Sequence, residues 1–200
     1  PSENFNGDIL VDITVGDGEL TDMQTFMLTV IPINDSIAFA PISNQTTQED
    51  TPLTFDLDIV DIDGPFLVLN YEHTGNVEIS FVSNSITITP YLNWFGSTDI
   101  TIIAFDGEFT AEQSFTLDVV SVNDIPVISA IVNQQINEDT FLTLNLSATD
   151  IEGDDLSFSA LSGESYTAQV SGDILTVIPV QDFNGDLDIT VSVSDGQNSD

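Results

Sequence analysis

Residues 100–119 read ITIIAFDGEFTAEQSFTLDV, and apolar residues fill alternate positions on both sides of an Asp-Gly pair. The alternating apolar residues are Ile100, Ile102 and Ala104, followed by Phe115, Leu117 and Val119. A period of two is typical of strands that bury one face. The pair Asp106-Gly107 favours a turn, because glycine adopts a positive φ without steric cost. The stretch therefore predicts two strands joined by a turn.

The same alternation runs through the residues before this stretch, and helical periodicity is nowhere convincing. Further strands are predicted at residues 45–48, 53–57, 67–72, 77–81 and 86–88. Seven short strands in about 90 residues are typical of a Greek-key β-sandwich. The fold class is thus predicted to be all-β, with a seven-stranded sandwich as its unit.

The sequence repeats with a period of 89 residues, without insertion or deletion. Pro1, Pro90 and Pro179 share one phase (90 − 1 = 89 and 179 − 90 = 89). The other groups in phase are Asp17-Gly18, Asp106-Gly107 and Asp195-Gly196, then Asn34-Asp35 and Asn123-Asp124, then Glu49-Asp50-Thr51 and Glu138-Asp139-Thr140. Fixed spacing indicates tandem domains of roughly 90 residues, each large enough to have its own core.

The period divides the chain into three predicted parts. Residues 1–35 are the C-terminal part of a repeat, residues 36–124 a complete repeat, and residues 125–200 a repeat that lacks its last strand. One interpretation is a slice of a longer array, because domain boundaries normally fall in linkers. The other is donor-strand completion, in which residues 1–35 of one copy supply the missing strand of another and build a head-to-tail filament.

The chain contains 34 acidic residues and no lysine or arginine. Its carboxylates therefore need water, backbone N–H groups or an external cation. With 41% apolar residues the chain is predicted to fold, and Ca²⁺ is the expected cation because its ligands are carboxylate, amide and carbonyl oxygens. A halophilic surface is a minor alternative that does not explain the fixed phases. Nucleic acids are excluded as ordinary partners, because no lysine or arginine is present to neutralise phosphate.

Cysteine is absent, which excludes a disulfide framework and thiolate metal sites. No run of about 18 apolar residues predicts a membrane-spanning helix in this sequence, and no basic, apolar export signal opens it. These features fit a bacterial or archaeal surface protein that is stabilised by ions. We therefore expect an extracellular or cell-surface location.

Five motifs follow one another in fixed order through residues 36–124. They are Glu49-Asp50-Thr51-Pro52-Leu53-Thr54, Asp61-Ile62-Asp63-Gly64, Thr89-Pro90 with Asn93-Trp94-Phe95-Gly96, Phe105-Asp106-Gly107, and Val122-Asn123-Asp124-Ile125-Pro126. With them the chain resembles, over its entire length, the cadherin-like tandem repeats of large bacterial and archaeal surface proteins and adhesins. The resemblance implies secreted cadherin- or Ig-like sandwich domains, linkers rigidified by Ca²⁺, and a role as an extender or adhesive stalk.

Acids on the loops at facing ends of stacked sandwiches converge, with the linker between them. Carboxylate and amide oxygens on these segments predict Ca²⁺ junctions that cancel repulsion and lock the interdomain angle. The ligands predicted for the second junction are Glu49, Asn123, Asp124, Asp150, Glu152 and Asp195. Those predicted for the first junction are Asn34, Asp35, Asp61, Asp63 and Asp106, and the position equivalent to Glu49 falls before Pro1.

Several of these features also have a simpler interpretation. An Asp-Gly pair is most often a turn, because aspartate bonds its own backbone, and Glu49 could be an exposed loop acid. Trp94 shares its phase with Phe5 and Phe183, which predicts a core aromatic rather than a sugar-stacking platform. His73, the one histidine, is predicted to lie in a solvated loop.

The leading hypothesis is a non-enzymatic spacer of a cell-surface adhesin, stalk or filament, whose partners are neighbouring repeats or copies of itself. The alternative is a carbohydrate-binding or accessory module of a secreted enzyme, which would expose a row of aromatic side chains. Tyr71, Tyr91 and Tyr166 are too few for such a row and out of register. Catalysis is not expected, because a chain without Lys, Arg or Cys has few means to tune a carboxylate pKa or stabilise an anionic transition state.

Overall fold

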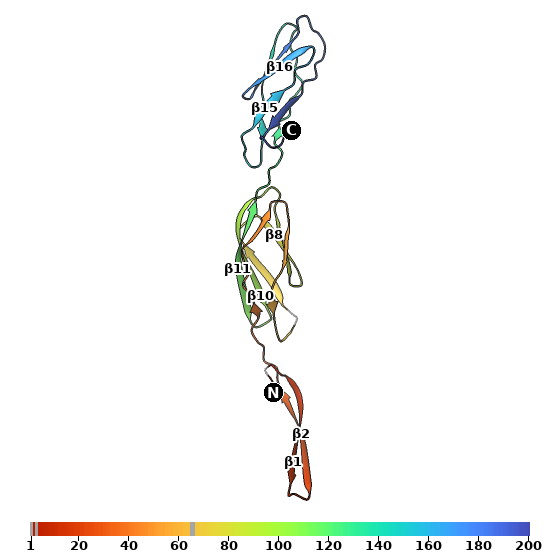
Figure 1. Ribbon diagram of the computed structural model, residues 1–200, viewed down its shortest axis with the longest axis vertical. Helices are drawn as coiled ribbons and strands as arrows, with labels where there is room; N and C mark the ends of the chain where they lie inside the picture. The colour runs from red at the N-terminus through yellow and green to blue at the C-terminus, as the bar shows by residue number, and fades with distance from the viewer. Residues whose placement is uncertain (1, 3, 65–66) are drawn as a thin grey trace. The chain divides into compact units, whose positions relative to one another are not determined.

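The computed structural model describes residues 2, 4–64 and 67–200, and all of their regular secondary structure is β (Figure 1). Pro1, the first of the prolines in phase, lies outside the described residues. None of the described residues belongs to a helix that is long and apolar enough to cross a membrane. Two compact units make up the chain: Pro1–Gln45, Leu53–Ile88 and Thr98–Leu117 form the first, and Thr46–Pro52, Thr89–Ser97 and Asp118–Asp200 the second. The division into residues 1–35, 36–124 and 125–200 stays a prediction.

The first unit begins with an antiparallel hairpin of β1 (Gly7–Gly16) and β2 (Thr21–Val30) (Figure 1). Val11 lies opposite Phe26, and Leu28 follows on the same face because alternate residues of a strand point the same way. Phe26 is 47% exposed and Leu28 is 46% exposed. The hairpin therefore leaves one apolar face partly uncovered.

Nine strands follow among the described residues between 38 and 120, which leave out 65 and 66. They are β3 (Ala38–Phe39), β4 (Gln45–Gln48), β5 (Leu53–Asp56), β6 (Ile59–Val60), β7 (Val68–His73), β8 (Val77–Val82), β9 (Ser85–Pro90), β10 (Gly96–Phe105) and β11 (Thr110–Val120). One sheet has the order β4-β11-β10-β7 and another the order β5-β9-β8, with β3 and β6 as a separate pair. The all-β sandwich predicted from the sequence is confirmed, and β11 lies between β4 and β10.

Alternating side chains form the core of the first unit, as the pattern of two predicts. Ile100, Ile102 and Ala104 on β10 are each 0% exposed. Phe55 and Phe115 pack edge to face with their ring centroids 5.9 Å apart, a geometry that the charge distribution of aromatic rings favours. The stretch quoted above thus supplies both a turn and much of the core.

Seven shorter strands of the second unit lie between residues 127 and 194. They are β12 (Val127–Ile128), β13 (Leu142–Asn145), β14 (Ala148–Thr149), β15 (Ser157–Ala160), β16 (Tyr166–Ser171), β17 (Ile174–Pro179) and β18 (Val191–Ser194). The sheet orders are β13-β17-β16, β15-β18 and β12-β14. Leu146, Ala168, Leu175 and Val177 form the buried cluster of this unit.

His73 is exposed, as predicted, but it is the last residue of strand β7 rather than part of a loop. Trp94 is half-buried, and its backbone N–H donates a hydrogen bond to the carbonyl of Tyr91 at 3.0 Å.

Burial along β10 leads to a first prediction. Ile102→Ala removes a fully buried side chain and is expected to lower the free energy of unfolding by about 2–5 kcal/mol, from lost burial and a residual cavity. Val82→Ala, at a position that is 77% exposed, is the control and should change it by less than about 0.5 kcal/mol. Urea denaturation followed by circular dichroism measures both values. Equal losses would contradict the burial of Ile102.

Candidate metal centre

Glu49 is a buried acid in the second unit, directly after β4. Its own N–H donates to the carbonyl of Val120 at 2.9 Å, and its Oε1 accepts the N–H of Val122 at 2.6 Å. Asp50, the next residue, has a φ of 56° and ends the strand. These contacts hold the Glu49 side chain, 3% exposed, against the segment that follows β11.

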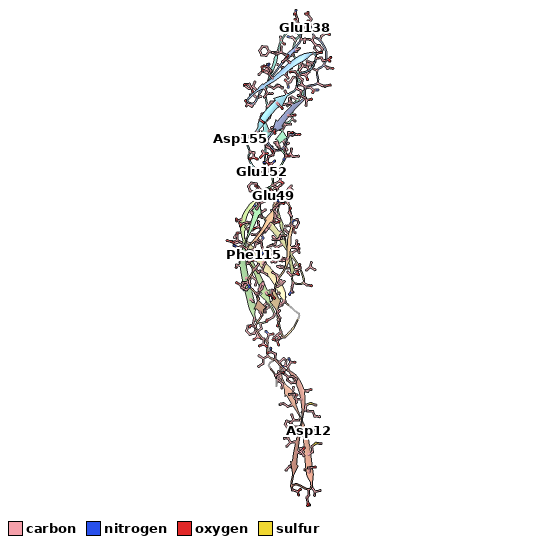
Figure 2. The ribbon with its side chains drawn as sticks, in the orientation of Figure 1. Asp12, Glu49, Phe115, Glu138, Glu152 and Asp155 are labelled. Carbon is pink, nitrogen blue, oxygen red and sulfur yellow. The ribbon has the colours of Figure 1, made fainter. Side chains whose placement is uncertain are left out.

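Two further acids of the second unit, Asp124 and Glu152, lie beside Glu49; Figure 2 labels Glu49 and Glu152. One carboxylate oxygen each of Glu49, Asp124 and Glu152 lies within 4.8 Å of the other two. Asp124 precedes β12, and Glu152 lies between β14 and β15. The N–H of Asp124 donates to Oε2 of Glu152 at 3.0 Å. Among the described residues, this is the group of three acids close enough to hold one ion.

Four buried carboxylate oxygens in this region have no hydrogen-bond donor. They are Oε2 of Glu49, Oδ2 of Asp124, Oδ2 of Asp150 and Oε1 of Glu152. A buried polar atom without a partner costs free energy, and a buried charge costs more. The chain has no lysine or arginine to approach them. The oxygens must therefore be neutralised by protons or by a cation from outside.

The donor set fits a hard divalent cation. Such an ion takes carboxylate oxygens from several segments, together with carbonyl oxygens and water. Here four acids offer unpartnered oxygens, and they come from three separate segments of the second unit. A thiolate-preferring metal is excluded, because the sequence contains no cysteine.

The pKa of Asp124 is raised by its burial and by the acids around it. Burial raises the pKa of this carboxyl above its ordinary value, and repulsion by Glu152, Asp50 and Asp150 raises it further. Asp50, the residue after Glu49, thus contributes to the negative field at Asp124. Without a cation, ionisation of Asp124 is therefore less favourable than in an unfolded chain.

Asn123 and Asp195, also predicted as ligands, form a hydrogen-bonded pair at the edge of the cluster. Nδ2 of Asn123 donates to Oδ2 of Asp195 at 2.8 Å, and to the carbonyl of Asp124 at 3.0 Å. Oδ1 of Asp195 accepts the N–H groups of Gln197 and Asn198, both at 2.6 Å. Both oxygens of Asp195 are therefore already engaged, which fits a residue that orients Asn123.

Gln197 is a contributor that sequence reasoning missed. Its Nε2 donates to Oδ1 of Asn123 at 2.7 Å. The equivalent positions in the repeat hold Glu19 and Glu108 (197 − 89 = 108 and 108 − 89 = 19). No phase signal therefore pointed to this residue.

The five residues predicted for the first junction lie in the first unit and repeat part of this arrangement. Nδ2 of Asn34 donates to Oδ2 of Asp106 at 3.1 Å. The N–H of Asp35 donates to Oδ2 of Asp63, and that of Asp63 to Oδ1 of Asp61 at 3.0 Å. The hydrogen bonds of Asn34 and Asp35 recur 89 residues later at Asn123 and Asp124. Among the described residues these acids are not brought into a cluster of three.

Asp17, Asp106 and Asp195 each serve a turn. Oδ1 of Asp106 accepts the N–H groups of Glu108 and Phe109, both at 2.7 Å. These two bonds, in that order, are the largest causes that hold the pKa of Asp106 below its ordinary value. The Asp-Gly pairs therefore have the turn role that their composition favours.

The end of the chain that carries most of this site resembles a known family. Residues 123–200 match the bacterial Ig domain. The match includes Asp124, Asp150 and Glu152 but not Glu49. No curated protein matches the chain.

Solved structures with related strand arrangements share little sequence. An endo-fucoidan hydrolase from glycoside hydrolase family 107 is 18% identical with a TM-score of 0.39, over 98% of this chain and 33% of that chain. The titin domains z1z2 in complex with telethonin are 15% identical with a TM-score of 0.37, over 84% and 93%. Extracellular cadherin domains 1–4 of protocadherin gamma B7 are 16% identical with a TM-score of 0.42, over 94% and 54%. At these scores no conclusion about activity or ligands follows.

The pKa shifts give a prediction with opposite signs at two aspartates. A raised pKa means that ionised Asp124 destabilises the fold above that pKa, and that the penalty fades as the pH falls toward 3.8. Asp124→Asn should therefore raise the melting temperature at pH 7 in EDTA, and the gain should shrink on acidification.

Asp195→Asn is the matched control for Asp124→Asn. Hydrogen bonds from Asn123 first, then from the N–H groups of Asn198 and Gln197, lower the pKa of Asp195 below 3.8. Ionised Asp195 therefore adds stability that is lost as the pH falls through its lowered pKa, and its replacement should lower the melting temperature at pH 7. Thermal melts from pH 7 to pH 3 test both signs, and a loss of stability in metal-free Asp124→Asn would contradict the crowding.

Proposed function

We propose that this chain is a non-enzymatic, extracellular structural or adhesive module, stiffened by Ca²⁺ bound at Glu49, Asp124, Asp150 and Glu152. The observation that carries the proposal is the set of four buried carboxylate oxygens without donors. A chain that folds with such oxygens in place needs a cation to make them favourable.

The cation would supply the positive charge that the sequence lacks. Glu49 follows β4, Asp124 lies between β11 and β12, and both Asp150 and Glu152 lie between β14 and β15. Each acid anchors one of three segments of the second unit. Drawing their oxygens to one centre would hold the connection between β11 and β12 in one conformation.

The other predicted ligands have supporting roles in this proposal. Asp195 fixes Asn123, and Asn123 fixes the backbone of Asp124. Asp35 and Asp63 repeat the bond of Asp124 and Glu152 in the first unit. We infer that the same hydrogen-bonded arrangement holds the acids in both units, and that in the second unit Glu49 adds the third carboxylate that an ion needs.

An extracellular location follows from the cation. Ca²⁺ sites of moderate affinity fill outside cells, where the ion is abundant, and a fold without disulfides gains stability from each bound ion. With no nucleophilic cysteine and no basic side chain to stabilise an anionic transition state, the expected output is mechanical. We therefore place the chain in a surface stalk, adhesin or filament.

Removing one charge at the centre tests Ca²⁺ binding. Glu49→Gln should abolish most of the rise in melting temperature that Ca²⁺ gives the unaltered chain, an effect of about 2.7 kcal/mol at a hundredfold excess over Kd. Glu138→Gln is the matched control, because Glu138 has the same phase as Glu49 (138 − 89 = 49) but is exposed. Calorimetric titration and thermal melts measure both. Equal responses of the two variants would refute the site.

Stiffness is tested separately by small-angle scattering in Ca²⁺ and in EDTA at equal ionic strength. In Ca²⁺ the particle should have a larger maximum dimension and should be less flexible than in EDTA, because a bridged connection has fewer conformations. Glu49→Gln should resemble the EDTA sample in both solutions. A profile that ignores chelation, although Ca²⁺ binds, would separate binding from stiffening and overturn the mechanical role.

A further inference from the structure

The loop between β9 and β10, residues 91–95, exposes large apolar side chains. It reads YLNWF. Tyr91 is 55% exposed, Leu92 is 82% exposed and Phe95 is 40% exposed. Single apolar residues scattered over a surface are ordinary, but here they are gathered within one short loop. The β9–β10 loop is therefore a patch whose exposure needs a physical reason.

Hydrogen bonds within the second unit fix the backbone of the β9–β10 loop. The N–H of Asn93 donates to Oδ1 of Asp50 at 2.9 Å, and Asn93 has a φ of 55°. The N–H of Trp94 donates to the carbonyl of Tyr91 at 3.0 Å. The Trp94 ring lies against Gly96, where an added Cβ would meet one of its carbon atoms at 3.6 Å. These contacts use backbone atoms, one acid and the Trp94 ring, and they leave the exposed apolar side chains free.

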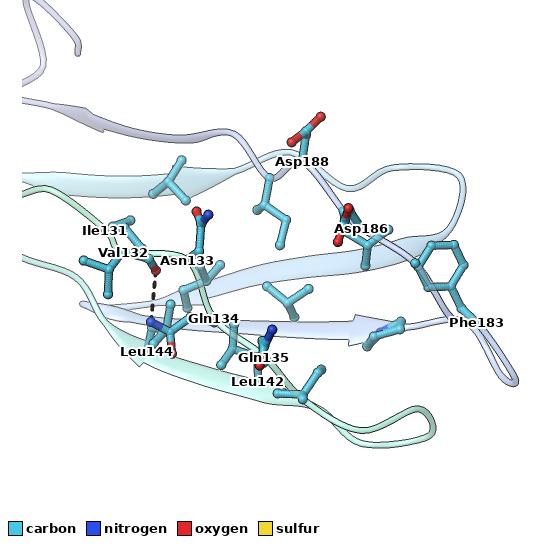
Figure 3. A pocket seen from close by; sticks show the side chains of 18 of the residues that line it. Ile131, Val132, Asn133, Gln134, Gln135, Leu142, Leu144, Phe183, Asp186 and Asp188 are labelled. Atoms are coloured by element: carbon cyan, nitrogen blue, oxygen red, sulfur yellow. Dashed lines mark hydrogen bonds between the residues drawn. The ribbon is translucent and has the colours of Figure 1, made fainter.

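The loop 89 residues later has the same backbone, and Figure 3 labels its Phe183. The N–H of Asp182 donates to Oδ1 of Asp139 at 3.0 Å, and Asp182 has a φ of 59°. The N–H of Phe183 donates to the carbonyl of Val180 at 3.2 Å. The Phe183 ring lies against Gly185, where an added Cβ would meet it at 3.5 Å. Each contact that fixes the β9–β10 loop thus has its counterpart in the later loop.

The two loops differ at the exposed positions. Leu92 and Phe95 correspond to Gln181 and Asn184 (181 − 89 = 92 and 184 − 89 = 95). Gln181 and Asn184 are exposed as well, so this backbone forms without an apolar side chain at either place. Packing within the chain therefore does not explain Leu92 and Phe95. A contact with another molecule would explain them, since loops on a rigid scaffold are where binding residues gather.

Acids lie beside the β9–β10 loop. Asp50, which accepts the N–H of Asn93, is exposed. Directly after the loop, the hydroxyl group of Ser97 donates to Oδ1 of Asp118, which is exposed too. The chain has no lysine or arginine to offset these charges. A molecule that approaches the loop therefore enters a negative field.

This field selects the kind of molecule that the loop can bind. A second copy of this chain brings a net charge of −34 and is repelled. Anionic lipid headgroups and nucleic acids are repelled for the same reason. A segment with both apolar and basic side chains is favoured twice, because it covers apolar surface and places positive charge near Asp50 and Asp118.

We propose that the β9–β10 loop is a docking surface for a basic, amphipathic segment of another protein. Tyr91, Leu92 and Phe95 bind the apolar side chains of that segment, and Asp50 and Asp118 attract its lysine or arginine side chains. The contact uses none of the four acids that have unpartnered oxygens, so it does not rest on the proposed Ca²⁺ site.

Trp94 allows a direct test, because it is the one tryptophan of the chain and belongs to the loop. A synthetic peptide of leucine and lysine, without tryptophan, is added to the full chain at low ionic strength while the fluorescence of Trp94 is followed. Binding should shift the emission of this half-buried ring to shorter wavelength until the change saturates. A peptide of equal length made of leucine and glutamate should leave the emission unchanged, because the acidic chain repels it.

The later loop supplies a variant that keeps the backbone. Leu92→Gln combined with Phe95→Asn places the side chains of residues 181 and 184 on the β9–β10 loop, so the melting temperature should not change. The dissociation constant for the leucine–lysine peptide, measured by calorimetry, should rise about tenfold or more, because apolar burial is lost. Val82→Ser, at an exposed position of β8, is the matched control and should bind like the unaltered chain.

Three results would overturn the proposal. One is an equal affinity of the loop variant and of Val82→Ser, which would mean that the peptide binds acidic surface anywhere on the chain. Another is peptide binding that leaves the emission of Trp94 unchanged. The third is an emission shift with phosphatidylcholine vesicles but not with the peptide, which would assign the loop to a lipid surface. None of these results bears on Ca²⁺ binding at Glu49, so the two hypotheses fail separately.

Discussion

The absence of every lysine and arginine is the constraint on which the rest of this structure depends. Each carboxylate must find water, a backbone N–H, a hydroxyl or amide group, or a cation from outside. On the hairpin, hydroxyl groups donate these hydrogen bonds: that of Thr25 to Asp12 and that of Thr29 to Asp8, both at 2.7 Å. In the turns, backbone N–H groups are the donors, as they are for Asp106. At Glu49 and its neighbours neither kind of donor is present for one oxygen of each acid.

The acids of the candidate metal centre therefore fall into two groups: those whose oxygens all accept hydrogen bonds, and those that keep an oxygen without a donor. An aspartate whose two oxygens accept hydrogen bonds has its pKa lowered, as at Asp195, and stabilises the fold without help. An aspartate buried among other acids, such as Asp124, has its pKa raised by burial first and by repulsion second, and its ionised form destabilises the fold until a proton or a cation neutralises it. Both kinds occur within one site, and they carry the same amino acid. The hydrogen bonds of each oxygen, rather than the number of acids, therefore decide where a bound cation would stabilise the fold most.

Much of the fold was predictable because alternation is a local property. The segments predicted at 45–48, 77–81 and 86–88 appear as β4, β8 and β9, and their ends differ by a few residues at most. Strands of two residues, such as β3 and β12, were not predicted, since two residues cannot display a period. Residues 185–190 keep the alternation of Leu187 and Ile189 yet form no strand. A strand needs a partner, and partners are not encoded in its own pattern.

The candidate site was predictable only in part, for a similar reason. The period of 89 residues pointed to acids that the structure places near one another, among them Glu49, Asp124 and Glu152. Whether an aspartate forms a turn or offers a free oxygen is not visible in the sequence, because Asp-Gly serves both uses. Gln197 could not be found by phase at all. Which of these residues bind an ion stays a prediction.

The metal centre follows from one physical situation, which is a set of acids whose counter-charge no lysine or arginine of this sequence supplies. One carboxylate oxygen each of Glu49, Asp124 and Glu152 lies within 4.8 Å of the other two, so their negative charges repel one another. A cation placed between them would remove that repulsion and would also satisfy the buried oxygens that have no donor. In an acidic chain without lysine or arginine, the binding of such an ion and the ordering of the segments that carry its ligands would therefore be coupled.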